Sequence, residues 1–461
     1  MSKPELLSDL MNKIEKGPYE RKSKEYLRKS LCYESISNIY FSMNEYPPVI
    51  IRGKDVSVWD LDGKEYIDVA SGFSVHNIGH CHPKVVEAVK QQSEKLVQWC
   101  AMPNELRLEY SKKLVEISPG KSKKKVHLLT TGGESVEFAC KLARYYKAKP
   151  LIMAFQGCYH GVTGGIINAT TYPSYRASDP FLQNTGFVHV PYAYCYRCPF
   201  GREYPECKLF CADYIEYLLE GKLTAASDIA TLIVEPIQGV GGYIVPPDEY
   251  IPELAKICKD HGILLFMDEI QTAFGRYGDA MTASEALKIE PDIMCVGKAL
   301  SGGFPLSAAI TRDEIAAKWE PIKSSETFMG NLLMCAVAMT NINILEEMNA
   351  PMLAKKIGTY MLRTFKETLE DLKIIGDIRG KGGFLAIELV EDKKTKKPIS
   401  EEVRKYAYDL TLKRGLIVNF GAGNYGNVID IAPPLVISEN QVDAAAHILR
   451  EALVETIKHH F

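Results

Sequence analysis

Three apolar runs between residues 231 and 310 predict the centre of the fold. The runs are Thr231–Val234, Ile263–Met267 and Asp292–Val296, and helix-length segments separate them. Short apolar runs without alternation are typical of buried parallel strands that crossover helices connect. We therefore predict an α/β fold with a mostly parallel central sheet flanked by helices.

The residues that follow these runs predict where a site lies. Residues 235–239 follow the first run, 268–271 the second, and 297–303 the third. Ligands of such sheets bind at the carboxyl ends of the strands. We therefore expect Asp268 and Lys298 to face one crevice.

A glycine pair stands where another predicted strand, residues 126–129, meets a helix that we expect from Val136 to Tyr146. Backbone N–H groups at a helix N-terminus, together with the positive end of the helix dipole, suit a phosphate. The spacing of Gly132 and Gly133 equally allows a simple helix cap.

The chain ends are predicted to form a smaller α+β domain beside the central one. Strand-like alternation marks residues 49–69, and helical periods alternate with strands such as Gly383–Leu389 and Leu416–Asn419 in the C-terminal part. The predicted regions are an N-terminal helical arm (1–42), the first part of the small domain (43–85), the large domain (86–331) and the rest of the small domain (332–461).

Composition narrows the classes of function. The 461 residues include 55 basic and 58 acidic side chains, so a net charge of −3 argues against a nucleic-acid partner. No apolar run approaches the roughly 18 residues that cross a bilayer, and residues 1–7 are too charged for a secretory signal. We expect a soluble cytoplasmic protein that acts on a small molecule and keeps its 12 cysteines reduced.

A cysteine-rich insertion, residues 192–217, interrupts the large domain. Its four cysteines are Cys195, Cys198, Cys207 and Cys211. Four thiolates at such spacing are able to bind zinc or an iron–sulfur cluster. Buried free thiols are the alternative, because the second pair has three intervening residues rather than two. The sequence leaves this metal question open.

The strand-end motifs resemble those of the class III aminotransferases, the ornithine or ω-aminotransferase group of the fold-type I pyridoxal-phosphate enzymes. That family carries Asp-Glu-(Ile/Val)-Gln-(Thr/Ser)-Gly-x-Gly-Arg-Thr-Gly and then a lysine after the next strand. Residues 268–278 read Asp-Glu-Ile-Gln-Thr-Ala-Phe-Gly-Arg-Tyr-Gly, with Ala273 and Tyr277 as departures, and Lys298 follows. The resemblance extends from about Tyr46 to the C-terminus.

The resemblance implies pyridoxal 5'-phosphate as the cofactor and assigns two catalytic residues. Lys298 is expected to form a Schiff base with the cofactor aldehyde and then to move the substrate proton. Asp268 is expected to keep the ring nitrogen protonated. A surface lysine in a glycine-rich turn is the alternative for Lys298, which the match at Asp268 disfavours.

Further cofactor contacts are implied by the same resemblance. Gly132 and Gly133 are expected to bind the phosphate, with Gly133 in place of the usual hydroxyl residue. Tyr159 is expected to stack on the cofactor ring, with Ile270 beneath the ring. An ordinary tyrosine of the core is the alternative for Tyr159. Gln271 is expected to bond the phenolic oxygen.

A second copy of the chain is also implied. Residues 324–331 match the family's (Gly/Ser)-Ser-Thr-Phe-Gly-Gly-Asn, with Glu326 and Met329 as departures. In the family, the threonine reaches the phosphate bound to the neighbouring subunit. Thr327 therefore implies a homodimer with shared active sites, or a tetramer.

Departures from the family bear on the substrate. Val162 and Asp430 stand where family members that use 2-oxoglutarate carry arginines, and Val240 replaces the gate glutamate. A desolvated aspartate would repel an α-carboxylate. We expect an ω- or β-amino donor (an amine, a diamine, an amino sugar, a β-amino acid or a β-aminoacyl thioester). The family's loop at residues 71–80 helps to wall the substrate pocket, so the resemblance makes Phe73 a candidate lining residue, and an aromatic residue of the core is the equal alternative.

The acceptor is expected to be a 2-oxo acid such as 2-oxoglutarate or pyruvate. Its carboxylate needs a cation, for which Arg197 or Arg202 of the insertion is a candidate. An amino-acid racemase, epimerase or decarboxylase of the same family is the alternative function. A non-catalytic binding module ranks last, because both Lys298 and Asp268 are present.

Overall fold

The computed structural model describes residues 3–35, 46–99, 102–172, 175, 186–221, 226–321 and 323–461. Residues 36–42 of the predicted arm and the first three residues of the predicted region 43–85 lie outside the described residues.

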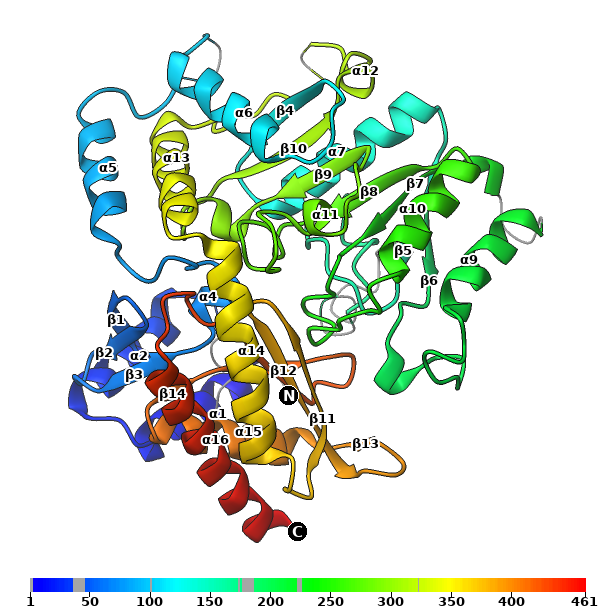
Figure 1. The fold of residues 1–461 in the computed structure, drawn as a ribbon. Coiled ribbons are helices and arrows are strands. Elements are labelled where there is room, and N and C mark those ends of the chain that lie inside the picture. The colour runs from blue at the N-terminus through cyan, green and yellow to red at the C-terminus, as the bar shows by residue number, and fades with distance from the viewer. Residues whose placement is uncertain are drawn as a thin grey trace.

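The described residues form a seven-stranded central sheet, in the upper part of Figure 1. Strands β5 to β9 pair in parallel, whereas β10 runs antiparallel to its neighbours β9 and β4. The order across the sheet is β4 (Lys124–Leu129), β10 (Ser307–Arg312), β9 (Ile293–Val296), β8 (Leu264–Asp268), β7 (Ile229–Val234), β5 (Leu151–Phe155) and β6 (Phe187–Val190).

Burial explains why the sequence of this sheet lacks alternation. Every residue of β7, β8 and β9 is buried, because helices pack against the sheet. Helix α7 (Gly132–Lys147) contacts β4, β5, β7, β9 and β10, and α10 (Tyr250–Asp260) contacts β8. The structure thus has the mostly parallel α/β sheet that the apolar runs predict.

Two further sheets occupy the lower part of Figure 1. One contains β1 (Ile50–Lys54), β2 (Ser57–Asp60), β3 (Glu65–Asp68) and β14 (Leu416–Ile417). The other contains β11 (Ile375–Lys381), β12 (Phe384–Asp392), β13 (Lys397–Pro398), β15 (Asn419–Ala422) and β16 (Val428–Ile431). Elements from both chain ends therefore lie together, since β14 pairs with β3.

The single strand expected at Leu416–Asn419 is wrong. The chain crosses from one sheet to the other at the fully buried Val418, so the segment divides into β14 and β15. A run of apolar residues carries no signal for such a crossing.

Helices cover the outer faces of these sheets. The helix expected from Val136 begins at Gly132, because Thr131 caps it. The other helices of at least eight residues are α1 (Lys3–Lys16), α2 (Arg21–Tyr33), α5 (Pro83–Ser93), α6 (Glu105–Ile117), α9 (Phe210–Glu220), α13 (Leu332–Glu347), α14 (Ala350–Leu369), α15 (Glu401–Lys413) and α16 (Glu439–His460). Shorter helices are α4 (Ser71–Ser74), α11 (Ala283–Ala286) and α12 (Asp313–Ala316). None of the helices described is both long and apolar enough to cross a bilayer.

The cysteine-rich insertion packs around a small cavity of about 20 Å³. Cys195, Cys198, Cys207 and Cys211 all line this cavity as free thiols. Among the described residues, no three of the four sulfur atoms lie within 4.8 Å of one another. Folding thus brings both cysteine pairs of the insertion to one cavity.

Candidate active site

A cavity of about 440 Å³ lies at the carboxyl ends of the central strands. Segments that follow β4, β5, β7, β8 and β9 supply its walls. The lining residues are Thr131, Gly132, Gly133, Tyr159, His160, Gly161, Val162, Thr163, Glu235, Ile237, Val240, Asp268, Ile270, Gln271, Thr272 and Lys298. The predicted crevice therefore brings together Asp268, Lys298 and six other predicted residues.

One end of the cavity is the N-terminus of α7. Thr131 and Glu134 form a capping box, in which the Thr131 side chain accepts from the Glu134 N–H. The N–H groups of Gly132 and Gly133 precede any intrahelical acceptor. A Cβ on Gly161 would lie 2.7 Å from Gly133 Cα, so only a glycine fits at position 161 beside this helix end. The helix is thus capped by side chains while the N–H groups of Gly132 and Gly133 stay available at the cavity.

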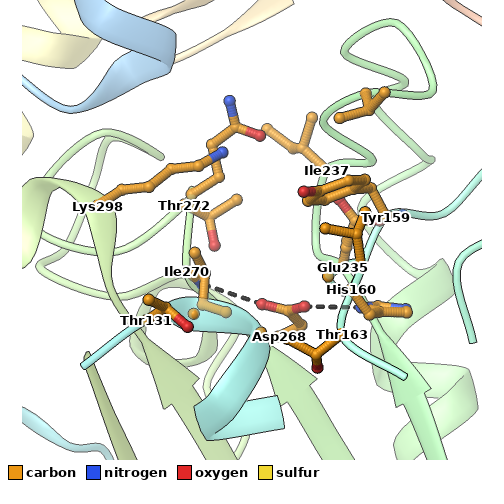
Figure 2. Close-up of a pocket in the computed structure, with 16 residues that line it drawn as sticks. Thr131, Tyr159, His160, Thr163, Glu235, Ile237, Asp268, Ile270, Thr272 and Lys298 are labelled. Atoms are coloured by element: carbon orange, nitrogen blue, oxygen red, sulfur yellow. Dashed lines mark hydrogen bonds and ion pairs between the residues drawn. The ribbon is translucent and has the colours of Figure 1, made fainter. Parts of the chain in front are cut away.

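Lys298 begins the 3-10 turn that follows β9, and its φ of 45° is a backbone conformation that non-glycine residues rarely adopt. Its side chain crosses the cavity from the wall opposite Tyr159 and Ile237 (Figure 2). Burial lowers the pKa of Lys298 to about 8, against the charges of Glu235, Asp268 and Asp430, which raise it. The amine is therefore easier to deprotonate than an ordinary lysine.

Asp268 ends β8 and is paired with a histidine behind it. Its Oδ2 lies 2.7 Å from His160 Nδ1, and its Oδ1 accepts from the Ile270 N–H at 3.1 Å (Figure 2). Burial alone would lower the pKa of His160, but Cys158 and Asp268 raise it well above its usual value. His160 and Asp268 are thus paired at the floor of the cavity.

Glu235 is a second carboxyl group of the cavity. It follows β7, and its two oxygens accept from the Tyr159 N–H at 2.9 Å and the Gly239 N–H at 2.8 Å. Burial and the nearby Asp268 raise the pKa of Glu235 to about 6. Sequence reasoning assigned no role to Glu235 or His160, although both stand in the strand-end segments where chemistry was expected.

Gln271 joins the cavity to a hydroxyl cluster. Its Nε2 donates to Ser74 Oγ at 3.0 Å and to Tyr243 Oη at 3.2 Å, and these two oxygens are 2.9 Å apart. Ser74 and Tyr243 are buried and come from the N-terminal α4 and the segment after β7. Neither was predicted, because each reaches Gln271 across a long stretch of sequence.

Three predicted residues lie outside the lining. Phe73 is 44% exposed on the surface, and Thr327 is exposed in its loop. Asp430 is buried on β16, where it interacts electrostatically with Lys298 and Arg379. Burial raises the pKa of Asp430 well above its usual value.

The two arginines considered for the acceptor carboxylate also lie elsewhere. Arg197 Nε donates to Glu388, and the Arg202 guanidinium stacks on Phe210 at 3.7 Å. None of the described residues lining the cavity is an arginine.

Comparisons with known proteins agree with this geometry. The aminotransferase class-III family profile matches residues 40–453. This chain belongs to the class III aminotransferase family. It is 36% identical over 439 residues to a leucine/methionine racemase from Thermococcus litoralis, covering 93% of this chain and 96% of that one. It is also 36% identical over 418 residues to an acetylornithine aminotransferase from Methanopyrus kandleri, covering 90% and 97%.

A crystal structure of an (S)-enantioselective ω-transaminase from Thermomicrobium roseum superimposes with a TM-score of 0.86. The identity is 32%, and the superposition covers 94% of this chain and 99% of that one. The predicted fold type I, pyridoxal phosphate cofactor and aminotransferase class are therefore confirmed.

Proposed function

We propose that this class III aminotransferase takes the amino group from an ω- or β-amino donor and gives it to a 2-oxo acid such as 2-oxoglutarate or pyruvate. The proposal rests mainly on the charges around Lys298. The described lining of the cavity contains no arginine, and the buried Asp430 interacts electrostatically with Lys298. An ionised Asp430 would repel an α-carboxylate, and a protonated one gives it no cation to pair with. An ordinary α-amino acid is therefore disfavoured as the main donor.

The chain offers a suitable group for each part of the cofactor. Gly132 and Gly133 would bind the phosphate, and Asp268, backed by His160, would hold the ring nitrogen protonated. The remaining contacts would come from Tyr159 and Ile270 on the two ring faces and from Gln271. Pyridoxal phosphate supplies an aldehyde for the amine of Lys298 and a ring that withdraws electrons from the substrate carbon.

Lys298 is the group that would carry the proton. Once the donor has taken its place on the cofactor, the free Nζ would accept the proton of the donor carbon and return it to the cofactor side. A pKa of about 8 leaves part of the Lys298 amine neutral near pH 7, which this step requires. Ile237 and Val240, which line the same cavity, would exclude water.

The oligomer belongs to the same proposal. We infer a homodimer in which Thr327 reaches the partner's phosphate site, since Thr327 is exposed outside the cavity of its own chain. Exposed apolar side chains accompany it: Phe328 in the same loop, Trp99 and Met102. A cytoplasmic location is likewise proposed.

A racemase is the second candidate, and the relative from Thermococcus litoralis supports it. A two-base racemase delivers a proton to either face of the substrate carbon and therefore has a second proton carrier opposite the lysine. The wall opposite Lys298 presents Ile237 and Tyr159, and burial raises the pKa of Tyr159 to about 12. This wall favours the aminotransferase.

Single-turnover mixing with amines, diamines and ω-amino acids tests the proposal. Without an oxo acid, an aminotransferase loses its cofactor absorption band once, and 2-oxoglutarate or pyruvate restores it. Persistent absorption together with loss of optical activity in an α-amino acid would instead establish the racemase.

A further inference from the structure

Glu388 is a buried carboxylate where the insertion meets the C-terminal sheet. It stands in β12, its side chain has no exposed surface, and it accepts from Tyr194 Oη, from Arg197 Nε and from Arg379 Nη1. Burial alone would raise the pKa of Glu388, but Arg379, Tyr194 and Arg197 together hold it below its usual value. Tyr194 and Arg197 of the insertion thus stabilise the ionised Glu388 of the C-terminal sheet.

Arg379 connects Glu388 to the backbone beside the cavity. Its Nη1 bonds Asp377 at 2.8 Å and Glu388 at 2.9 Å, which leaves Nε to donate to the carbonyl oxygens of Gly242 at 3.1 Å and Tyr243 at 3.2 Å. A guanidinium is planar, so fixing one edge on Glu388 fixes the direction of the other.

The backbone that Arg379 holds is the rim of the cavity. Val240 lines the cavity, and Tyr243 Oη meets Gln271 there through the hydroxyl cluster. A second route reaches the same segment, because Arg197 lies over the Tyr425 ring at 5.1 Å and Gly423 N donates to Val240 O at 2.9 Å.

We propose that Tyr194 and Arg197 of the cysteine-rich insertion are positioning residues that set the substrate rim, residues 239–243, through Glu388 and Arg379. The proposal rests on the aminotransferase function for its kinetic readout. In this proposal the insertion affects substrate binding, although none of its side chains contacts the substrate. Without Tyr194 and Arg197, Arg379 is the one cation left at Glu388. The Arg379 guanidinium then turns toward Glu388. As a result, the carbonyls of Gly242 and Tyr243 lose their hydrogen-bond donor.

The test uses the holoenzyme and the variants Tyr194→Phe, Arg197→Gln and the double variant. Since each change removes one hydrogen bond to a buried charge, the double variant should raise the donor KM about tenfold. Its kcat should stay within about twofold of wild type, because Lys298 and Asp268 are untouched. Hydrogen exchange should speed up at residues 239–243, and Arg197→Lys should recover part of the KM.

Tyr204→Phe is the matched control. Tyr204 belongs to the same insertion, but its hydroxyl bonds the exposed Glu249 at 3.0 Å, so KM and exchange should stay at wild-type values. Unchanged KM and exchange in the double variant would overturn the proposal, as would faster exchange throughout the chain or an equal effect of Tyr204→Phe. If no donor reacts with the wild type, the proposed function fails, whereas exchange at 239–243 still decides the role of the insertion.

Discussion

The inner end of the cavity and its rim are built in different ways. At the inner end, Gly132, Asp268 and Lys298 each stand within three residues of the end of a central strand. At the rim, Arg379 donates to the carbonyls of Gly242 and Tyr243, and its other partners come from the insertion, β11 and β12. The groups for the chemistry are thus placed by the sheet itself, whereas the substrate contacts depend on packing between distant segments.

Charge separates the two regions as well. At the rim, Arg379 and Arg197 balance Glu388 and Asp377 in one closed network. At the inner end, the carboxyl groups of Asp268 and Glu235 lie close to Lys298 and His160, and Glu235 and Asp268 both raise the pKa of Lys298. A carboxylate at this end would suit a bound cationic ring.

Loss of the inner carboxylate should have the largest effect. In Asp268→Asn, the ring nitrogen of the bound cofactor loses its carboxylate partner. The buried His160 loses the same carboxylate. Breaking a buried pair costs about 3–5 kcal/mol, and a loss of that size in the transition state would lower kcat/KM by about 10²–10⁴-fold. Steady-state kinetics with the best donor checks this.

The control for that variant is Asp279→Asn, which breaks an exposed ion pair with Lys355 and should leave kcat/KM unchanged. A loss of less than tenfold in Asp268→Asn would show that the inner end does not depend on this charge.

A smaller effect should come from the partner contact. Thr327→Ala should weaken pyridoxal phosphate binding roughly tenfold, because one hydrogen bond to a charged phosphate is lost, with kcat unchanged at saturating cofactor. Equilibrium dialysis measures the Kd. Thr359→Ala, which removes a hydroxyl bonded within its own helix, is the control. Equal affinity in Thr327→Ala and wild type would contradict the shared site.

The smallest change is a shift in pH dependence. The charge of Glu235 raises the pKa of Lys298, while burial lowers it to about 8. In Glu235→Gln burial acts with less opposition, so the midpoint for deprotonating Lys298 should fall below about 8. The pH dependence of cofactor incorporation into apoprotein reports this midpoint. Glu249→Gln, at the surface, should leave it in place, and an upward shift in Glu235→Gln would refute the electrostatic account.

The same contrast explains what the sequence could predict. Asp268, Lys298 and the glycine pair follow buried strands, so local pattern and family motif were sufficient to bring them to one cavity. His160, Glu235 and Tyr243 act through contacts made only on folding, and the Glu388 network joins residues nearly two hundred positions apart. The fold shows a similar limit at Val418. The chain passes from one sheet to another there, and the local sequence does not predict this change. The roles of the individual site residues and the three boundaries between the predicted regions stay predictions.

The most direct test of the central claim is the covalent link at Lys298. Purified protein loaded with pyridoxal phosphate is reduced with borohydride, digested and mapped by mass spectrometry. The cofactor should be found on the peptide containing Lys298, and Lys298→Ala should yield none. A label on another lysine, or no label in the wild-type protein, would contradict the account.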